Sequence, residues 1–144
     1  MKKHLRVFTS LLALSMLFMT GCGQKNYRTI EEWYNDNPSL RSSINTELEN
    51  ADEDGETSAM IIEDNTLVYS IQLEEKVFGE SEEDDAICKA FFDETFEAEK
   101  ETYVSIIPDL ADLSGVPESS ISVRIEIYNP GESSPSYTKT FTNQ

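Results

Sequence analysis

The sequence predicts an α+β domain: N-terminal short helices, then two β-hairpins that form a four-stranded antiparallel sheet packed on one long helix (α-α-β-β-α-β-β). Residues 58–75 and 120–141 are rich in β-forming residues, and apolar side chains stand at alternate positions over 67–74, 121–128 and 137–141, which is typical of strands buried on one side. Residues 80–115 carry apolar side chains three or four positions apart, which indicates an amphipathic helix. We therefore expect this helix to lie across the apolar face of the sheet.

The N-terminal segment has the organisation of a secretory signal peptide. Three basic residues, Lys2, Lys3 and Arg6, precede an apolar run from Val7 to Met19. About 13 apolar residues are too few for a membrane span, which needs roughly 20, but they suit the hydrophobic region of a signal peptide. We therefore expect residues 1–21 to be a leader that is removed from the mature chain.

Cys22 directly follows two small residues, Thr20 and Gly21. This order resembles the lipobox of bacterial lipoproteins, although Met19 stands where leucine is usual. The resemblance implies cleavage between Gly21 and Cys22 and a lipid on the Cys22 sulfur, which would anchor the chain to the outer face of the bacterial plasma membrane. Residues 22–26 would then be the lipidated cysteine and a short tether, and residues 27–144 a single acidic α+β domain. The alternative is an ordinary signal peptide with a chance cysteine, or a buried helix.

Acidic residues dominate the predicted mature chain. Three of the 11 basic residues lie in the leader, so eight remain against 28 Asp and Glu, a net charge near −20. Nucleic acid would be repelled by such a surface, because its binders are normally basic. His4 leaves with the leader, and Cys88 has no partner once Cys22 is lipidated, which excludes an internal disulfide, structural zinc and histidine-based catalysis. We expect no cofactor and no enzymatic activity.

Two short helices are predicted before the first strand. Thr29 can cap the first helix. Asn37 and Pro38 suit the N-cap and the first turn of the second helix, which we expect to run to about Asn50. The apolar face of this second helix recurs every four residues, at Leu40, Ile44 and Leu48.

Each hairpin is marked by turn residues between its two runs. Asp64 and Asn65 separate the runs of the first hairpin, and residues 129–132 (NPGE) begin the turn of the second. Apolar and polar residues alternate over residues 67–74, 121–128 and 137–141, which assigns these side chains to the two faces of a sheet.

The long helix between the hairpins has start and stop signals. Ser81 suits its N-cap and Gly115 its C-cap. Pro108 cannot donate a backbone hydrogen bond, so we expect a kink or a restart near Ile107. The apolar stripe of this helix is Ile87, Phe91, Phe92, Phe96, Tyr103, Ile106, Leu110 and Leu113.

Several segments together resemble a known family. They are the lipobox, EEWYND at 31–36, NTLVYS at 65–70, the acidic helix, and SVRIEIYN at 122–129. The chain is similar to a domain-of-unknown-function family of small lipoproteins from Gram-positive bacteria (Firmicutes). This resemblance implies Gram-positive membrane anchoring and brings no assigned activity or catalytic residues.

Asn50, Asp52 and Asp54 resemble the start of an EF-hand calcium loop. The twelfth position of such a loop needs a bidentate glutamate, but Ile61 stands there, and we expect Ile61 to be a strand residue that faces the core. Weak cation binding and a plain acidic turn therefore both stay open for this segment.

Other acidic groups allow less specific hypotheses. The acids from Glu80 to Asp85 could capture cations, but they also suit a solvated helix start stabilised by the helix dipole. Pairs among Glu94, Glu97 and Glu101 lie on one helix face, so a carboxylate-dependent hydrolase is a third possible function. We interpret Cys88 as a buried structural cysteine, because neighbouring anions disfavour its thiolate.

The sheet face opposite the helix is the predicted binding face. A face of hydroxyls with one arginine and one tyrosine can bind a peptide or a glycan, but it can also be the ordinary wet side of a sheet. Its principal candidates are Gln72, Arg124, Glu126 and Tyr128, with Ser70, Ser122, Thr138 and Thr140 around them.

These observations favour a membrane-anchored, non-catalytic binding module. The expected partner is a cationic or polar protein, peptide or cell-wall component that complements the acidic surface. The alternative is an accessory lipoprotein that captures cations or solutes.

Overall fold

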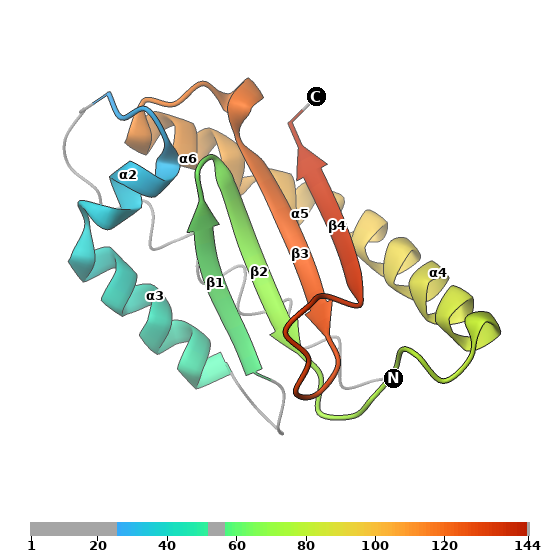
Figure 1. Cartoon of the computed structure of the whole chain (residues 1–144). Helices are drawn as coiled ribbons and strands as arrows, with labels where there is room; N and C mark the ends of the chain where they lie inside the picture. Colours follow the sequence, from blue (N-terminus) through green and yellow to red (C-terminus); the bar gives the residue numbers. More distant parts are fainter. Residues whose placement is uncertain (1–25, 52–56, 144) are drawn as a thin grey trace.

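The computed structural model describes residues 26–51 and 57–143, which form a four-stranded sheet with helices on one face (Figure 1). The elements in chain order are α2 (Ile30–Asn35), α3 (Pro38–Ala51), β1 (Thr57–Glu63), β2 (Thr66–Gln72), α4 (Glu82–Ala98), α5 (Lys100–Val104), α6 (Ile106–Ser114), the 3-10 helix η3 (Glu118–Ser120), β3 (Ser122–Tyr128) and β4 (Tyr137–Thr142). Within these residues, no helix is both long enough and apolar enough to cross a membrane.

The sheet is mixed, so the prediction of an entirely antiparallel sheet is wrong. Its order is β1-β2-β3-β4; both predicted hairpins are antiparallel, but β2 and β3 run parallel. The reason is the connection between them. A helical segment carries the chain from the end of β2 back to the end where β2 began, so β3 starts there and runs in the same direction.

The predicted long helix is divided into α4, α5 and α6, with breaks at Glu99 and Ser105. An unbroken helix over this segment would be about 50 Å long, whereas seven-residue strands measure only about 23 Å. The breaks therefore let the segment follow the sheet. Because α6 begins at Ile106, Pro108 lies in its first turn, where a missing backbone donor is tolerated.

The predicted caps at both ends of this segment are confirmed. The Ser81 hydroxyl accepts a hydrogen bond from the Asp84 amide, and Gly115 ends α6 with a left-handed φ of 75°. At α2, the Thr29 hydroxyl accepts from the Glu32 amide, as expected.

Helix α3 begins at Pro38 and runs one residue beyond the expected Asn50. Ile44 and Leu48 are buried against the core, and Leu40 packs beside them. The Asn37 side chain donates to the Trp33 carbonyl oxygen at 2.6 Å, which ties the end of α2 to the start of α3.

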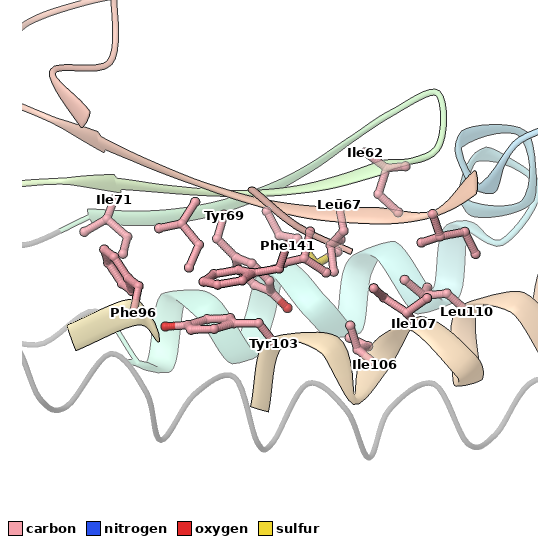
Figure 2. Close-up of a cluster of buried hydrophobic side chains, with 14 of the residues drawn as sticks. Ile62, Leu67, Tyr69, Ile71, Phe96, Tyr103, Ile106, Ile107, Leu110 and Phe141 are labelled. Atoms are coloured by element: carbon pink, nitrogen blue, oxygen red, sulfur yellow. The ribbon is translucent and has the colours of Figure 1, made fainter. Parts of the chain in front are cut away.

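The core lies between the sheet and helices α4–α6 (Figure 2). Leu67 and Tyr69 point from β2 toward Tyr103, Ile107 and the other helical residues below the sheet. Aromatic rings form a row along this layer, and the Tyr103 and Phe141 rings stack with centroids 5.3 Å apart. The Tyr69 hydroxyl is buried without a hydrogen-bond partner among the described residues, and burial raises the Tyr69 pKa.

Three apolar side chains that we expected in the core are exposed instead. Ile87 is 62% exposed, and the start of α4 lies beyond β4 in Figure 1. Phe91 is 38% exposed because α4 packs on Tyr137 of β4 through the next residue, Phe92. Ile61 is 48% exposed, since its partner in the β1–β2 register is Val68, on the face away from the helices.

The two ends of the sheet are fastened by different hydrogen bonds. At one end, which we call the α2 end, the Tyr27 amide donates to the Ser114 carbonyl (3.0 Å). Asn65, in the β1–β2 turn, accepts from the Ile30 amide through its side chain and from the Ser122 amide through its carbonyl oxygen. These bonds join the start of the domain, the β1–β2 turn, the end of α6 and the start of β3.

At the opposite end, which we call the Asn129 end, a single buried side chain holds two loops together. The Asn129 side-chain oxygen accepts from the Val77 and Phe78 amides, and its amide group donates to the Phe78 carbonyl and to Glu132. The loop between β2 and α4 is thereby fixed to the loop between β3 and β4.

The division of the helical segment makes a paired prediction. Ile107→Ala should lower the free energy of unfolding by about 2–5 kcal/mol, because Ile107 is fully buried. Ile87→Ala, the same change at an exposed position, should alter it by no more than about 0.5 kcal/mol. Urea unfolding of both variants measures this, and equal losses would contradict the packing of α4 and α6.

Candidate functional site

One face of the sheet is turned away from the helices, and we call it the open face (Figure 1). The strand register brings all four principal candidates from the sequence onto it, in neighbouring positions of β2 and β3. Its members include Ile61 and Glu63 of β1, Val68, Ser70 and Gln72 of β2, Ser122, Arg124, Glu126 and Tyr128 of β3, and Thr138 and Thr140 of β4.

Arg124 is the centre of the open face and is held by two carboxylates. Its Nη2 donates to Glu63 Oε2 at 2.5 Å, and its Nε lies 2.8 Å from Glu126 Oε1 as an ion pair without hydrogen-bond geometry. Partial burial alone would lower the Arg124 pKa, but the hydrogen bond to Glu63 and the negative charges of both glutamates outweigh it and raise the pKa. The guanidinium is therefore fixed in place as a cation.

Tyr128 extends this polar row along β3. Its hydroxyl donates to Glu126 Oε2 at 2.6 Å, and this hydrogen bond, followed by burial, raises the Tyr128 pKa. Gln72 is the register partner of Tyr128 on β2, and Ser70 is the register partner of Glu126. The candidates thus form a continuous polar group.

An apolar centre lies beside the polar row. Val68 is only 1% exposed although it is on the open face, and its register partners are Ile61 and Arg124. Long arginine side chains commonly cover apolar surface with their methylene groups while the charged end stays in water. The open face therefore combines the exposed apolar side chain of Ile61 with fixed hydrogen-bonding groups.

This arrangement suits recognition. A guanidinium has five N–H groups in a rigid plane, and only two of its nitrogens contact Glu63 and Glu126. The remaining N–H groups can donate to a carbonyl, hydroxyl or carboxylate oxygen of a partner. Sequence reasoning found Arg124 and Glu126 but missed Glu63, whose contact with Arg124 depends on the register across three strands.

A second cluster joins α4 to β4 on the helical side. Tyr137 Oη and Lys139 Nζ both donate to Asp93 Oδ1, at 2.8 and 3.1 Å, and Lys139 also pairs with Glu97 at 3.4 Å. The hydrogen bond from Tyr137, followed by that from Lys139, lowers the Asp93 pKa. These contacts hold the helix to the outer strand, so this cluster has a structural explanation.

Within the described residues, the structure does not assemble a cation site from the acidic residues that the sequence suggested. Asn50 lies at the end of α3 with its side chain outside the described part, and Asp52 and Asp54 lie outside the described residues altogether. Elsewhere, in 26–51 and 57–143, no group of three or more His, Cys, Asp or Glu is placed to hold a metal ion. Asp84 and Asp85 of the acidic helix start bond to Ser81 and to the Gly79 amide.

Cys88 is partly buried, not fully buried as we expected. Its sulfur lies 3.7 Å from the Val77 carbonyl oxygen. Burial and then the charges of Asp84, Asp85 and Glu80 raise the Cys88 pKa, which disfavours the reactive thiolate.

The Asp93 cluster makes a pH-dependent prediction. A lowered pKa in the folded state means that Asp93 contributes stability above the ordinary carboxyl pKa and loses it as the pH falls. Asp93→Asn should therefore be less stable than the wild type near neutral pH, and the difference should shrink between about pH 5 and pH 2.

Denaturant unfolding of the wild type and Asp93→Asn, at neutral pH and at about pH 2, measures this difference in stability. Glu94→Gln is the matched control, because it removes a neighbouring exposed carboxylate of α4. A gap between wild type and Asp93→Asn that is independent of pH would contradict the ionic role of Asp93.

The comparisons with known proteins concern almost the whole described domain. No curated protein and no solved structure matches the chain. A family model, a domain of unknown function (DUF4854), matches residues 30–141, from the first turn of α2 into β4. This match covers well over half of the chain and includes every strand of the open face, and the protein therefore belongs to the DUF4854 family.

Proposed function

We propose that this chain is a lipoprotein of a Gram-positive bacterium (Firmicutes), anchored to the outer face of the plasma membrane through Cys22. The observation that carries the proposal is the order of an apolar run, two small residues and a cysteine at positions 7–22. Tyr27, which makes the first backbone hydrogen bond described above, follows Cys22 by five positions, so the folded domain would stand close to the lipid.

The anchor is tested by changing each cysteine in turn. Cys22→Ser should abolish incorporation of radiolabelled fatty acid and release the chain from the membrane fraction, because the acyl-accepting sulfur is lost. Cys88→Ser removes the other cysteine and should leave both unchanged. Continued labelling of Cys22→Ser, or release of Cys88→Ser, would contradict lipidation at Cys22.

We further propose that the anchored domain is a non-catalytic binding module that uses the open face. Arg124, Glu126 and Tyr128 are fixed by one another, so little side-chain freedom would be lost when a partner binds. Glu63 and Glu126 flank Arg124 on the open face, and the mature chain would carry a net charge near −20. These charges favour a cationic or polar partner, such as a basic peptide segment or a hydroxyl-rich wall component.

The binding face is tested by photo-crosslinking on intact cells. A photoreactive amino acid at Thr138, exposed on the open face, should give an adduct of defined mass whose yield falls with added salt. The same amino acid at Glu94, exposed on the opposite side of the domain, should not give it. Equal adducts from both positions, or none from Thr138, would contradict the proposed face.

A further inference from the structure

The fold begins at one end of the sheet. The Tyr27 amide bonds to the Ser114 carbonyl, and the Ile30 amide bonds to the Asn65 side chain, so the first residues of the domain are fixed at the α2 end. Five residue steps separate Tyr27 from Cys22. Even a fully extended chain of this length spans at most about 18 Å. A lipid on Cys22 would therefore lie near the α2 end.

The strands carry the rest of the domain away from this end. β2 and β3 each contain seven residues, which corresponds to about 23 Å. The loop between β3 and β4 and the start of α4 both lie at the Asn129 end (Figure 1). This distance is more than two Debye lengths at physiological salt, each about 8 Å.

Charge favours the arrangement in which the Asn129 end is far from the membrane. The loops and the helix start at this end carry Glu74, Glu75, Glu80, Glu82, Glu83, Asp84, Asp85 and Glu132, whereas the α2 end carries fewer acids, among them Glu31, Glu32, Asp64 and Glu118. Anionic lipid headgroups repel acids that come within a Debye length of them, so the more acidic end is directed away from the membrane. The tether itself is basic, because Lys25 lies in it and Arg28 is the second residue after it.

We propose that the lipid anchor holds the domain end-on, with the α2 end against the membrane surface and the Asn129 end farthest from it. This inference rests on the proposed lipidation of Cys22. In this orientation the strands run away from the bilayer, and the open face is directed sideways. A partner of the open face would then lie beside the domain, as a neighbouring envelope molecule at the same distance from the membrane surface.

The orientation is tested with two matched fluorescent labels. In a Cys88→Ser background, Ser119→Cys places a label in η3 at the α2 end, and Ser133→Cys places one in the β3–β4 loop; both serines are exposed. The full-length chain is produced in a Gram-positive host, extracted with its lipid, and reconstituted in vesicles of phosphatidylglycerol and phosphatidylethanolamine that contain an acceptor-labelled lipid.

Energy transfer to the acceptor lipid should be at least ~2-fold stronger from position 119 than from position 133, because the strand length separates them by roughly 20 Å. A flexible insert of about ten Gly and Ser residues after Gln24 should reduce this difference, because the longer tether no longer restrains the domain. Equal transfer from both positions, or a difference that the insert leaves unchanged, would overturn the end-on orientation.

Failure of the orientation is distinguishable from failure of the anchor. A chain that floats with the vesicles but transfers energy equally from both labels is anchored without being end-on. A wild-type chain that does not float with the vesicles, like the Cys22→Ser control, overturns the anchor and the orientation together.

Discussion

The parallel pairing of β2 with β3 is the constraint on which the rest of the described structure depends. Parallel neighbours need a connection that returns along the length of the sheet, and α4, α5 and α6 supply it. Because this single crossover passes on one side, it covers one face and leaves the other for polar side chains. The same pairing sets Arg124 beside Val68 and Glu126 beside Ser70, which builds the open face from two strands that are distant in the sequence.

Two asparagines complete the sheet at its ends. Asn65 and Asn129 each follow or precede a strand, and each accepts backbone amide hydrogen bonds from a segment far away in the chain. A buried backbone amide without a hydrogen-bond partner costs free energy. The asparagine side-chain oxygen accepts from loop amides that no neighbouring strand can pair. The α2 end and the Asn129 end are thus each fastened to the sheet as parts of one domain.

Local patterns predicted the elements well, and the errors concern relations between elements. The parallel pair follows from topology, because the helical crossover between the two hairpins returns the chain to the end of the sheet where β2 began. The pattern of residues within each element does not predict this return. Met60, Ile61 and Ile62 are all apolar, so alternation could not assign Ile61 to a face, and only its pairing with Val68 does. Of the candidate site, the residues on β2 and β3 were predictable from alternation, but the contact between Arg124 and Glu63 required the register of three strands.

The position of Lys139 has a consequence for association between molecules. β4 is an outer strand of the sheet, and outer strands present unpaired backbone groups to which a strand of another molecule can add. The Lys139 ammonium lies on the helical side of this strand, paired with Asp93 and Glu97. A strand added beside β4 would bury the Lys139 ammonium under its own side chains, and burying a charge is costly. β4 is therefore a poor template for edge-to-edge aggregation. Lys139 in this way disfavours the addition of a second molecule at the β4 edge.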